Sequence, residues 1–366
     1  MATNAAFLLV SFGGPEGPDE VMPFLRNVTA GRNVPEDRLA QVAEHYYHFG
    51  GVSPINAQCR ELIAAVERQF AASGIDLPVY WGNRNWRPYL ADAIQAMADD
   101  GVTTAIALAT SAYSSYSSCR QYLDDIARAR AAVGPTAPRV IKIPPYYRHP
   151  GFIASFADAA GKALASLPAA LRGGAELVFT AHSIPESMAA VSGLHGGAYP
   201  AQLAEAAGLV AARLGRSTWK LAYQSRSGPP AVPWLGPDIG ECLRGIAAQG
   251  ATAAVVVPVG FVSDHMEVLF DLDIEAAQTA RGVGLPMARA ATPGTDPGFV
   301  AMISSLAASY AAGDGRNAAN TLGPDMSAFC GQHCCDRGPG LAAASRGIAS
   351  PARWVRRPPV TGTSCD

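Results

Sequence analysis

Short apolar, β-prone runs alternate with longer alanine-rich stretches along most of this chain, and this alternation constrains the fold more than any other feature. Such runs predict buried strands, and the apolar spacing between them predicts helices. Strands that alternate with helices favour right-handed βαβ units and a mostly parallel sheet. The expected strands are Phe7–Phe12, Val79–Gly82, Ala105–Thr110, Val140–Ile143, Leu177–Thr180, Lys220–Gln224, Ala253–Phe261 and Met287–Ala291. The expected helices include Ala57–Ala72, Leu90–Asp99, Gln121–Ala132, Phe152–Ala165 and Ala201–Leu214.

The two halves of the chain also resemble each other. LLVSFGGP, VYWGNRNWRP and ALATSAYSS in the first half are similar to LVFTAHSIP, LAYQSRSGPP and VVPVGFVSD in the second. Each segment is a strand that runs into a turn of small polar residues. We therefore predict two similar α/β domains, residues 5–147 and 148–325, with a cleft between them lined by strand ends. Residues 326–366 are predicted to form a cysteine-bearing tail whose end is disordered. The alternative is a single large doubly wound sheet.

Composition narrows the class of protein. The chain has 366 residues, of which 49% are hydrophobic, and this is enough to form a substantial core in two domains. A formal net charge of -2 argues against a nucleic-acid or acidic-membrane partner. The amino-terminal apolar stretch is too short for a signal peptide or a transmembrane segment, so we expect a cytoplasmic protein. Seven cysteines in that setting indicate metal or redox chemistry before disulfides.

His182 follows a predicted strand and precedes a predicted helix. Leu177–Phe179 is a short buried-strand run, and Ser183 to Glu186 form an S-x-x-E helix start with a proline in the first turn. Ligands of open α/β sheets bind at the carboxyl ends of the strands. His182 is therefore a candidate functional residue. The alternative is a histidine that only makes hydrogen bonds within its loop.

Three acidic residues recur at helical spacing after the last long strand run. Glu267, Asp271 and Glu275 are four residues apart, so one helix face carries all three. Like charges at that spacing destabilise an ordinary helix by a few tenths of a kcal/mol per pair. They predict either a solvated acidic face or a row of oxygen ligands that leads a divalent cation inward.

Several segments together resemble one family. They are SFGGPEGPDEVMPFLRNVTAGR, HFGGVSPIN, YWGNRNW, FTAHSIPESM, YQSRSGPPAVPWLGPD and GFVSDHMEVLFDLDIEA. They are similar to the ferrochelatases, and most similar to the actinobacterial coproporphyrin III group. The resemblance implies two Rossmann-like domains with parallel sheets and a porphyrin cleft between them. It also implies insertion of Fe²⁺ into coproporphyrin III to give coproheme in haem biosynthesis, with release of two protons.

The resemblance assigns roles to the histidine and the acidic row. His182 matches the family's A-H-S-[IL]-P histidine, and Glu267 matches the glutamate of D-H-x-E-V, so both are expected to bind iron and remove protons. Asp271 and Glu275 match an acidic line that delivers iron. A neutral imidazole suits ferrous iron and can also accept a pyrrole proton. The chemistry and the resemblance therefore agree on His182.

Four residues of the first half are expected to contact the porphyrin. Ser53 and Tyr122 match tetrapyrrole contacts in coproporphyrin-type enzymes, and Tyr46 and Phe12 are predicted to line the same pocket. The alternatives are a helix N-cap for Ser53 and a half-buried helix position for Tyr122. Bacillus-type members carry a tyrosine at the position of Phe12, which cannot bind a metal ion.

The porphyrin carboxylates must be held differently here than in Bacillus-type members. Thr29 and His45 stand where those members place arginines, so Arg32 is the predicted substitute. Arg84 and Arg226 each follow the second strand of a half. We predict that they form structural ion pairs or caps rather than substrate contacts.

The cysteine spacing indicates a metal–thiolate site. Cys330, Cys334 and Cys335 lie within six residues of one another, and a [2Fe–2S] cluster needs four ligands. The resemblance implies such a cluster, with Cys119 as the internal fourth ligand. The alternative is a tetrahedral zinc site that uses His333.

Other functions remain open on the same residues. The fold could serve a protoporphyrin IX ferrochelatase, a cobalt or nickel chelatase, or a tetrapyrrole or metal carrier without turnover. The pairing of His182 with Glu267 favours an enzyme, since a carrier needs no base at the ring centre. The expected partners are coproporphyrin III, ferrous iron and, transiently, neighbouring haem-pathway enzymes.

Overall fold

The computed structural model describes residues 4–31, 34–227, 231–314 and 334–335. These residues form two compact units. The first takes in the described residues up to Ser155, together with Val262–Met266 and those from Pro293 to Asp314. The second takes in Phe156–Phe261 and Glu267–Thr292, together with Cys334 and Cys335.

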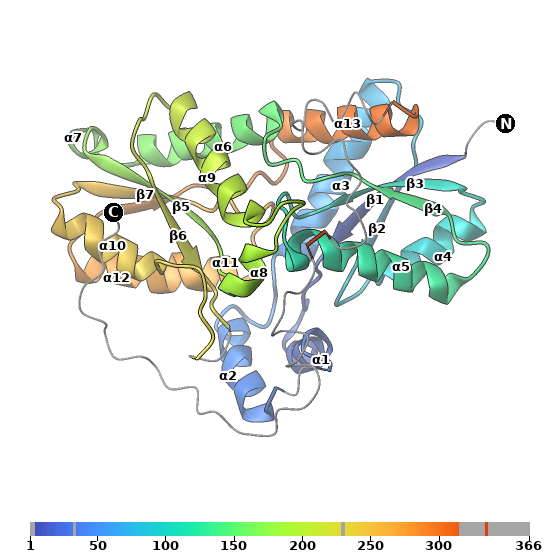
Figure 1. The fold of residues 1–366 in the computed structure, drawn as a ribbon, viewed down its shortest axis with the longest axis horizontal. Helices are drawn as coiled ribbons and strands as arrows, with labels where there is room; N and C mark the ends of the chain where they lie inside the picture. The colour runs from blue at the N-terminus through green and yellow to red at the C-terminus, as the bar shows by residue number, and fades with distance from the viewer. Residues whose placement is uncertain (1–3, 32–33, 228–230, 315–333, 336–366) are drawn as a thin grey trace. The chain divides into compact units, whose positions relative to one another are not determined.

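The first unit is built on a four-stranded parallel sheet in the order β2-β1-β3-β4 (Figure 1). Its strands are β1 Ala5–Ser11, β2 Val79–Asn83, β3 Thr104–Ala109 and β4 Arg139–Lys142. Helices α4 Leu90–Asp99 and α5 Gln121–Val133 bury an apolar cluster against one face. Helices α3 Ile55–Ala72 and α13 Pro297–Ala311 pack on the other. The carboxyl ends of β1, β2 and β3 therefore meet at one edge.

The second unit repeats the arrangement in the order β6-β5-β7-β8. Its strands are β5 Ala175–His182, β6 Lys220–Gln224, β7 Ala253–Val257 and β8 Met287–Arg289. One face packs against α10 Ile239–Ala248, the π-helix η2 Leu269–Ala276 and α12 Ala277–Gly282. Helix α9 Ala198–Arg213 contacts β5 and β6. β5 is central, so its carboxyl end lies between those of its neighbours.

The remaining helices connect or flank these sheets. They are α1 Pro18–Val28, α2 Glu36–Tyr47, the π-helix η1 Tyr116–Arg120, α6 Pro150–Ser166, α7 Ala169–Arg172, α8 Glu186–Ala190 and α11 Met266–Val268. Among the residues the structure describes, no helix is both long and apolar enough to cross a membrane.

The predicted fold class is confirmed, and all eight expected strands are present in two parallel sheets. Two strands are shorter than expected: β8 ends at Arg289 rather than Ala291, and β7 ends at Val257 rather than Phe261. Pro258 follows β7, and proline has no N–H to donate to a sheet. The predicted domain boundaries stay a prediction.

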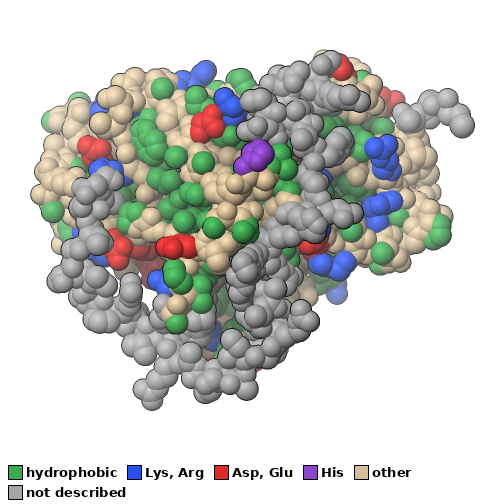
Figure 2. Space-filling model, viewed as in Figure 1, with side chains coloured by type: hydrophobic (Ala, Val, Ile, Leu, Met, Phe, Trp, Pro, Cys, Tyr) green, Lys and Arg blue, Asp and Glu red, His purple; other side chains and the backbone are tan. Residues whose placement is uncertain are grey.

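Figure 2 shows basic and acidic side chains scattered among apolar ones over the described residues of the viewed face, without a broad patch of one sign among them. This mixture is what a formal net charge of -2 leads us to expect.

Candidate functional site

The backbone around His182 is held at the carboxyl end of β5. His182 pairs in register with Gln224 of β6, and the N–H of Ser183 donates to the carbonyl of Gln224 at 2.8 Å. The hydroxyl of Tyr199, on α9, donates to the carbonyl of His182 at 2.9 Å. Burial raises the pKa of Tyr199, so this hydroxyl stays a donor. These bonds fix the position of the histidine in the strand.

The imidazole of His182 is oriented by its own loop. Its Nδ1 lies 2.6 Å from the carbonyl oxygen of Ser183. A carbonyl can only accept, so Nδ1 is the donor, and in the neutral imidazole the lone pair lies on Nε2. That Nε2 is 3.6 Å from Oε2 of Glu267, and the two side chains are 33% and 49% exposed. The pair therefore presents a basic nitrogen and a carboxylate side by side, within reach of solvent or a ligand.

The acidic row lies on a π-helix rather than on the regular α-helix that the spacing suggested. Glu267 is in the short α11, and η2 carries Asp271 and Glu275. A π-helix is rare and frequently occurs at functional sites. Glu267 and Glu275 are exposed, whereas Asp271 is only half-buried. The three carboxylates therefore run from an exposed position, through a more enclosed one, to a second exposed position.

Asp271 is the most perturbed member of the row. Ser225 donates its hydroxyl to Oδ2 of Asp271, and Nε2 of Gln224 is 3.5 Å from the same oxygen. Loss of water around Asp271, reinforced by repulsion from Glu267 and Glu275, raises its pKa to about 8. The hydrogen bond from Ser225 opposes this shift. Ser225 has a φ of 61° in the left-handed region, which costs free energy for a residue other than glycine.

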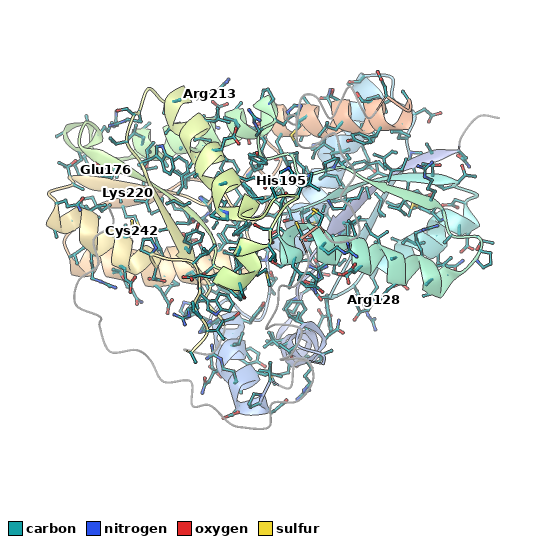
Figure 3. All side chains as sticks on the ribbon, viewed as in Figure 1. Arg128, Glu176, His195, Arg213, Lys220 and Cys242 are labelled. Carbon is teal, nitrogen blue, oxygen red and sulfur yellow. The ribbon has the colours of Figure 1, made fainter. Side chains whose placement is uncertain are left out.

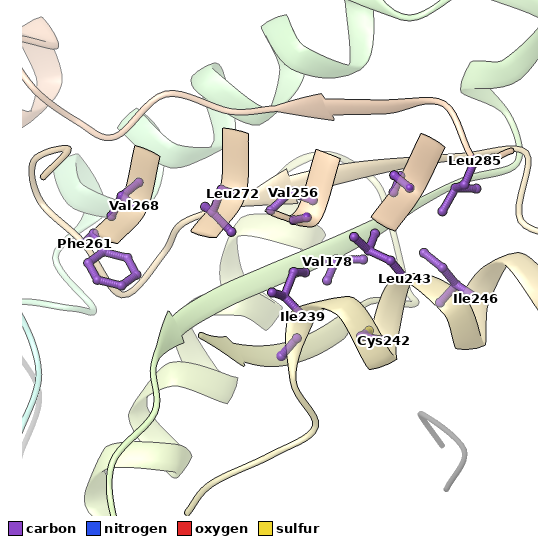
Figure 4. Close-up of a cluster of buried hydrophobic side chains, with 14 residues drawn as sticks. Val178, Ile239, Cys242, Leu243, Ile246, Val256, Phe261, Val268, Leu272 and Leu285 are labelled. Atoms are coloured by element: carbon purple, nitrogen blue, oxygen red, sulfur yellow. The ribbon is translucent and has the colours of Figure 1, made fainter. Parts of the chain in front are cut away.

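An apolar cluster packs against α11 and η2, the segment that carries the three acidic residues (Figure 4). Val268 and Leu272 pack with Val178 of β5, Val256 of β7 and Phe261, and all five are buried. Side chains locked in this way hold the backbone of α11 and η2 against the sheet. The carboxylates of the same segment are thereby fixed at the edge of the sheet.

Among the described residues of this unit, three buried polar atoms have no hydrogen-bond partner: Oγ1 of Thr180, Oε1 of Gln224 and Nε1 of Trp234. Thr180 is 0% exposed and Gln224 1%. Thr180 lies on β5, which ends at His182, and Gln224 is the last residue of β6 and pairs with His182. Trp234 bridges to Pro185, just beyond His182. Buried polar groups normally have partners, and exceptions concentrate where a ligand or water is needed. The region around His182 is therefore the polar site of this unit.

In the first unit, Ser53 lies against the loop that follows β1. It is 3% exposed, and its N–H donates to the carbonyl of Pro15 at 2.8 Å. A Cβ on Gly14 would lie 2.6 Å from Cβ of Ser53, so only glycine fits there. Helix α3 is capped by Pro54, so the alternative of a Ser53 N-cap is wrong.

Aromatic side chains gather beside the same loop. Tyr46 is 8% exposed and Tyr122 is 4% exposed, whereas Phe12 is half-buried. The ring centroid of Phe24 is 6.3 Å from that of Phe12 and 5.9 Å from that of Tyr46. Tyr122 is more buried than the half-buried alternative expected. Phe12 is the member of this group with ring surface left to offer a ligand.

Arg84 occupies the end of β2 in this unit, 4% exposed, and its Nε pairs with Oδ2 of Asp125. The predicted structural ion pair of Arg84 is thus confirmed. Arg226, past β6, donates to the carbonyl of Val232 at 3.1 Å, as a structural cap would. The hydroxyl of Thr29 donates to the carbonyl of Leu25 at 2.7 Å and so serves its own helix. Arg32, the predicted carboxylate ligand, lies outside the described residues.

The cysteines are only partly described. Cys119 is buried, with Nζ of Lys142 3.5 Å from its sulfur. Cys334 and Cys335 are buried with sulfurs 3.8 Å apart, and the N–H of Gly193 is 3.1 Å from Sγ of Cys335. Within the described part of the chain, no three His, Cys, Asp or Glu side chains are placed to hold a metal ion. Cys330 and His333 lie outside that part. The predicted cluster is therefore not confirmed.

Sequence reasoning missed Gln224 and Ser225 as site residues. Both lie in the segment LAYQSRSGPP, which was noted for its likeness to the first half rather than for its chemistry. Their position directly after a strand, beside the end of the His182 strand, is a signal that could have identified them.

Comparison with known proteins identifies close relatives. A sequence model described as ferrochelatase matches residues 4–311. The coproporphyrin III ferrochelatase of Nocardia farcinica is 57% identical over 304 residues, 82% of this chain and 86% of that protein. That of Streptomyces griseus is 50% identical over 358 residues, 93% and 95% of the two chains. A protein of Rhodopirellula baltica named ferrochelatase is 49% identical over 359 residues, 98% and 96% of the two chains.

Solved structures agree on the fold. SirB from Bacillus subtilis with Fe³⁺ has a TM-score of 0.53 at 12% identity, covering 84% of this chain and 97% of that one. A multi-domain Deinococcus radiodurans protein, described as structurally similar to chelatases, has a TM-score of 0.51 at 14% identity. That match covers 84% of this chain but 55% of the Deinococcus protein. At these identities the likeness concerns the fold alone.

Proposed function

The chain belongs to the ferrochelatase family, and we propose that it inserts Fe²⁺ into coproporphyrin III to give coproheme and two protons. The observation that carries this proposal is the pair of His182 and Glu267, with Nε2 and Oε2 3.6 Å apart. Metallation requires a base for the pyrrole N–H protons and a ligand that holds iron as it loses water. One basic nitrogen beside one carboxylate meets both needs.

His182 is the proposed base and iron ligand. The carbonyl of Ser183 holds Nδ1 in its protonated form, so Nε2 keeps a free lone pair for a proton or for Fe²⁺. Imidazole nitrogen suits ferrous iron among the first-row metals. The adjacent carboxylate of Glu267 stabilises the imidazolium that forms when Nε2 takes a proton. The two groups together remove the two protons that iron replaces.

Asp271 and Glu275 form the proposed route by which iron approaches. Carboxylate oxygens bind hydrated divalent cations, and Glu275 is exposed to solvent at one end of the row. The raised pKa of Asp271 means that a cation must displace a proton there near neutral pH. Iron would therefore pass this position without being trapped by a fully charged carboxylate cluster.

The first unit supplies the proposed porphyrin contacts. Phe12 offers a half-buried ring that packs against the cluster containing Tyr46, and Tyr122 and Ser53 are buried in the same unit. Because these three are nearly enclosed, they shape the wall more than they touch a ligand. Arg32 remains the proposed partner of a porphyrin carboxylate. Aromatic surface suits a flat macrocycle, and a rigid wall can help to bend it.

Coproporphyrin III is proposed over protoporphyrin IX because of the relatives. The Nocardia and Streptomyces proteins, 57% and 50% identical, are both named for coproporphyrin III. Transient contacts with enzymes that supply the porphyrin or consume the product, and a cytoplasmic setting, stay predictions.

A [2Fe–2S] cluster held by Cys119, Cys330, Cys334 and Cys335 is a separate proposal. Two of these sulfurs are adjacent and buried, and a backbone N–H contacts one of them. Such contacts are typical of cluster thiolates, and they tune the reduction potential. The absorption spectrum and the iron and sulfide content of anaerobically purified protein test this. Protein with neither iron nor sulfide contradicts it and leaves the chelatase proposal intact.

The chelatase proposal is tested by an anaerobic time course with Fe²⁺ and metal-free coproporphyrin III, beside protoporphyrin IX. We expect a Soret shift with coproporphyrin III and release of two protons per ring, measured with a pH indicator. Tight binding of the porphyrin without metallation contradicts the proposal and favours a carrier. Faster metallation of protoporphyrin contradicts the choice of substrate.

A further inference from the structure

Arg84 makes more contacts than a structural ion pair requires. Its guanidinium carbon lies over the ring of Tyr122, 4.5 Å from the centroid, and over the ring of Phe12, 5.7 Å from the centroid. Its side chain is 4% exposed, and Asp125, its partner, is 9% exposed. The cation thus touches the half-buried aromatic ring and the enclosed tyrosine behind it.

The pairing with Asp125 does not by itself explain this cation. Asp125 also pairs with Nη2 of Arg128, which is 71% exposed (Figure 3 shows Arg128 projecting outward from α5). Asp125 therefore already has a cationic partner, Arg128, whose side chain stays exposed to solvent. A buried ion pair is weak evidence for stability, because apolar side chains of similar volume often replace it without loss. The stacking on two rings is the feature that only a planar guanidinium provides.

We propose that Arg84 is a positioning residue. Its guanidinium stacks on Tyr122 and thereby fixes the ring of Phe12 in the orientation that receives the porphyrin. Arg84 is too enclosed to touch the substrate and acts through the rings. Asp125 fixes the guanidinium in turn, and the backbone N–H of Arg84 donates to the carbonyl of Ser11 at 2.9 Å, directly before Phe12. The inference rests on the proposed function, since it takes a porphyrin as the ligand.

The test uses Arg84→Lys in the full chain. Lysine keeps the charge that Asp125 needs but lacks the planar group that stacks on the rings. We expect a dissociation constant for metal-free coproporphyrin III about tenfold higher than that of the wild type, since stacking on a ring stabilises by this order. KM should rise by the same factor, while kcat stays within about twofold. Fluorescence quenching of the porphyrin measures binding without iron.

Two further variants complete the experiment. Arg84→Met also removes the stack, so it should raise the dissociation constant as Arg84→Lys does. Arg128→Gln removes the outer partner of Asp125 and leaves Arg84 in place, so it should bind porphyrin like the wild type. Thermal unfolding of each variant shows that it is folded. Wild-type affinity and KM in Arg84→Lys would overturn the inference and leave the chelatase proposal untouched. Wild-type protein that binds but does not metallate coproporphyrin III would contradict the proposed function alone, since the binding comparison still applies.

Discussion

The two units place similar segments at the same points of one scaffold and give them different chemistry. In each, a π-helix follows the third strand, η1 in the first unit and η2 in the second, and a carboxylate from the segment after that strand reaches the end of the second strand. In the first unit Asp125 meets the cation of Arg84. In the second unit Asp271 meets the neutral groups of Ser225 and Gln224. The carboxylate therefore belongs to an ion pair in the first unit, whereas in the second unit its pKa is raised to about 8.

The residues at the ends of the central strands, β1 and β5, also differ in chemistry. Phe12 lies three residues before Pro15, and His182 lies three residues before Pro185. A ring without a titratable group thus occupies in the first unit the place of the imidazole in the second. We therefore predict that the residue at the end of β5 is the base of the proposed reaction, whereas the residue at the end of β1 is a substrate contact.

The largest expected effect comes from replacing an acidic residue of α11 or η2 in the second unit. Glu267→Gln should lower kcat/KM by about 10³-fold, because a neutral amide neither stabilises the imidazolium nor binds iron strongly. Glu275→Gln, its matched control on η2, should lower kcat/KM by no more than about tenfold, since the role proposed for Glu275 is delivery of iron alone. Steady-state metallation kinetics measure both. Equal losses in the two variants would contradict the special role of the carboxylate next to His182.

The ion pair of the first unit should matter for stability. Asp125→Asn leaves the enclosed cation of Arg84 without its charge partner, which should destabilise the protein by about 3 kcal/mol or more. Chemical denaturation measures this loss, with Arg128→Gln as the control that removes only the exposed partner and should cost about 1 kcal/mol or less. A similar small loss in both variants would mean that Arg84 finds another partner.

Replacing Asp271 by asparagine should stabilise the protein rather than destabilise it, and the gain in stability should depend on pH. Its pKa of about 8 in the folded protein is above the ordinary value of 3.8, so the folded state binds this proton more tightly than the unfolded chain. Its contribution to stability is complete below about pH 4 and is lost as the pH rises through about 8. Asp271→Asn mimics the protonated form, so it should unfold at a higher temperature than the wild type at pH 8.5 and near the wild-type temperature at pH 4. A constant difference across this range would contradict the raised pKa.

The smallest expected effect concerns the backbone of Ser225. Ser225→Ala loses the hydrogen bond to Asp271 but keeps the left-handed φ, so it should destabilise by about 1 kcal/mol. Ser225→Gly loses the same bond but relieves the strain, so its stability should lie close to that of the wild type. Thermal unfolding ranks the two variants. A glycine variant less stable than the alanine variant would show that φ is not strained.

The strands could be predicted from sequence because each is a short apolar run, and burial on both faces of a parallel sheet demands that pattern. The helical segment after β7 was predicted as regular because π- and α-helices use the same residue types. The extended β7 was wrong because an apolar run continues through Pro258 to Phe261 while the backbone does not.

Site residues could be predicted where a short local sequence motif contains the reactive side chain. His182 and Glu267 were identified by their motifs, and the structure places them together. Asp271 accepts a hydrogen bond from Ser225, 46 residues away, and Arg84 pairs with Asp125, 41 residues away. Such long-range pairs follow from the sheet order, which a single sequence does not contain.

The most direct test of the division between the units is a single-turnover comparison of His182→Ala with Phe12→Ala. Each variant is first saturated with coproporphyrin III and then mixed anaerobically with Fe²⁺ while the Soret band is followed. We expect His182→Ala to bind porphyrin normally and to metallate it at least about 10³-fold more slowly. Phe12→Ala should bind more weakly but, once saturated, metallate within about tenfold of the wild-type rate. Near-normal metallation by His182→Ala would contradict the account.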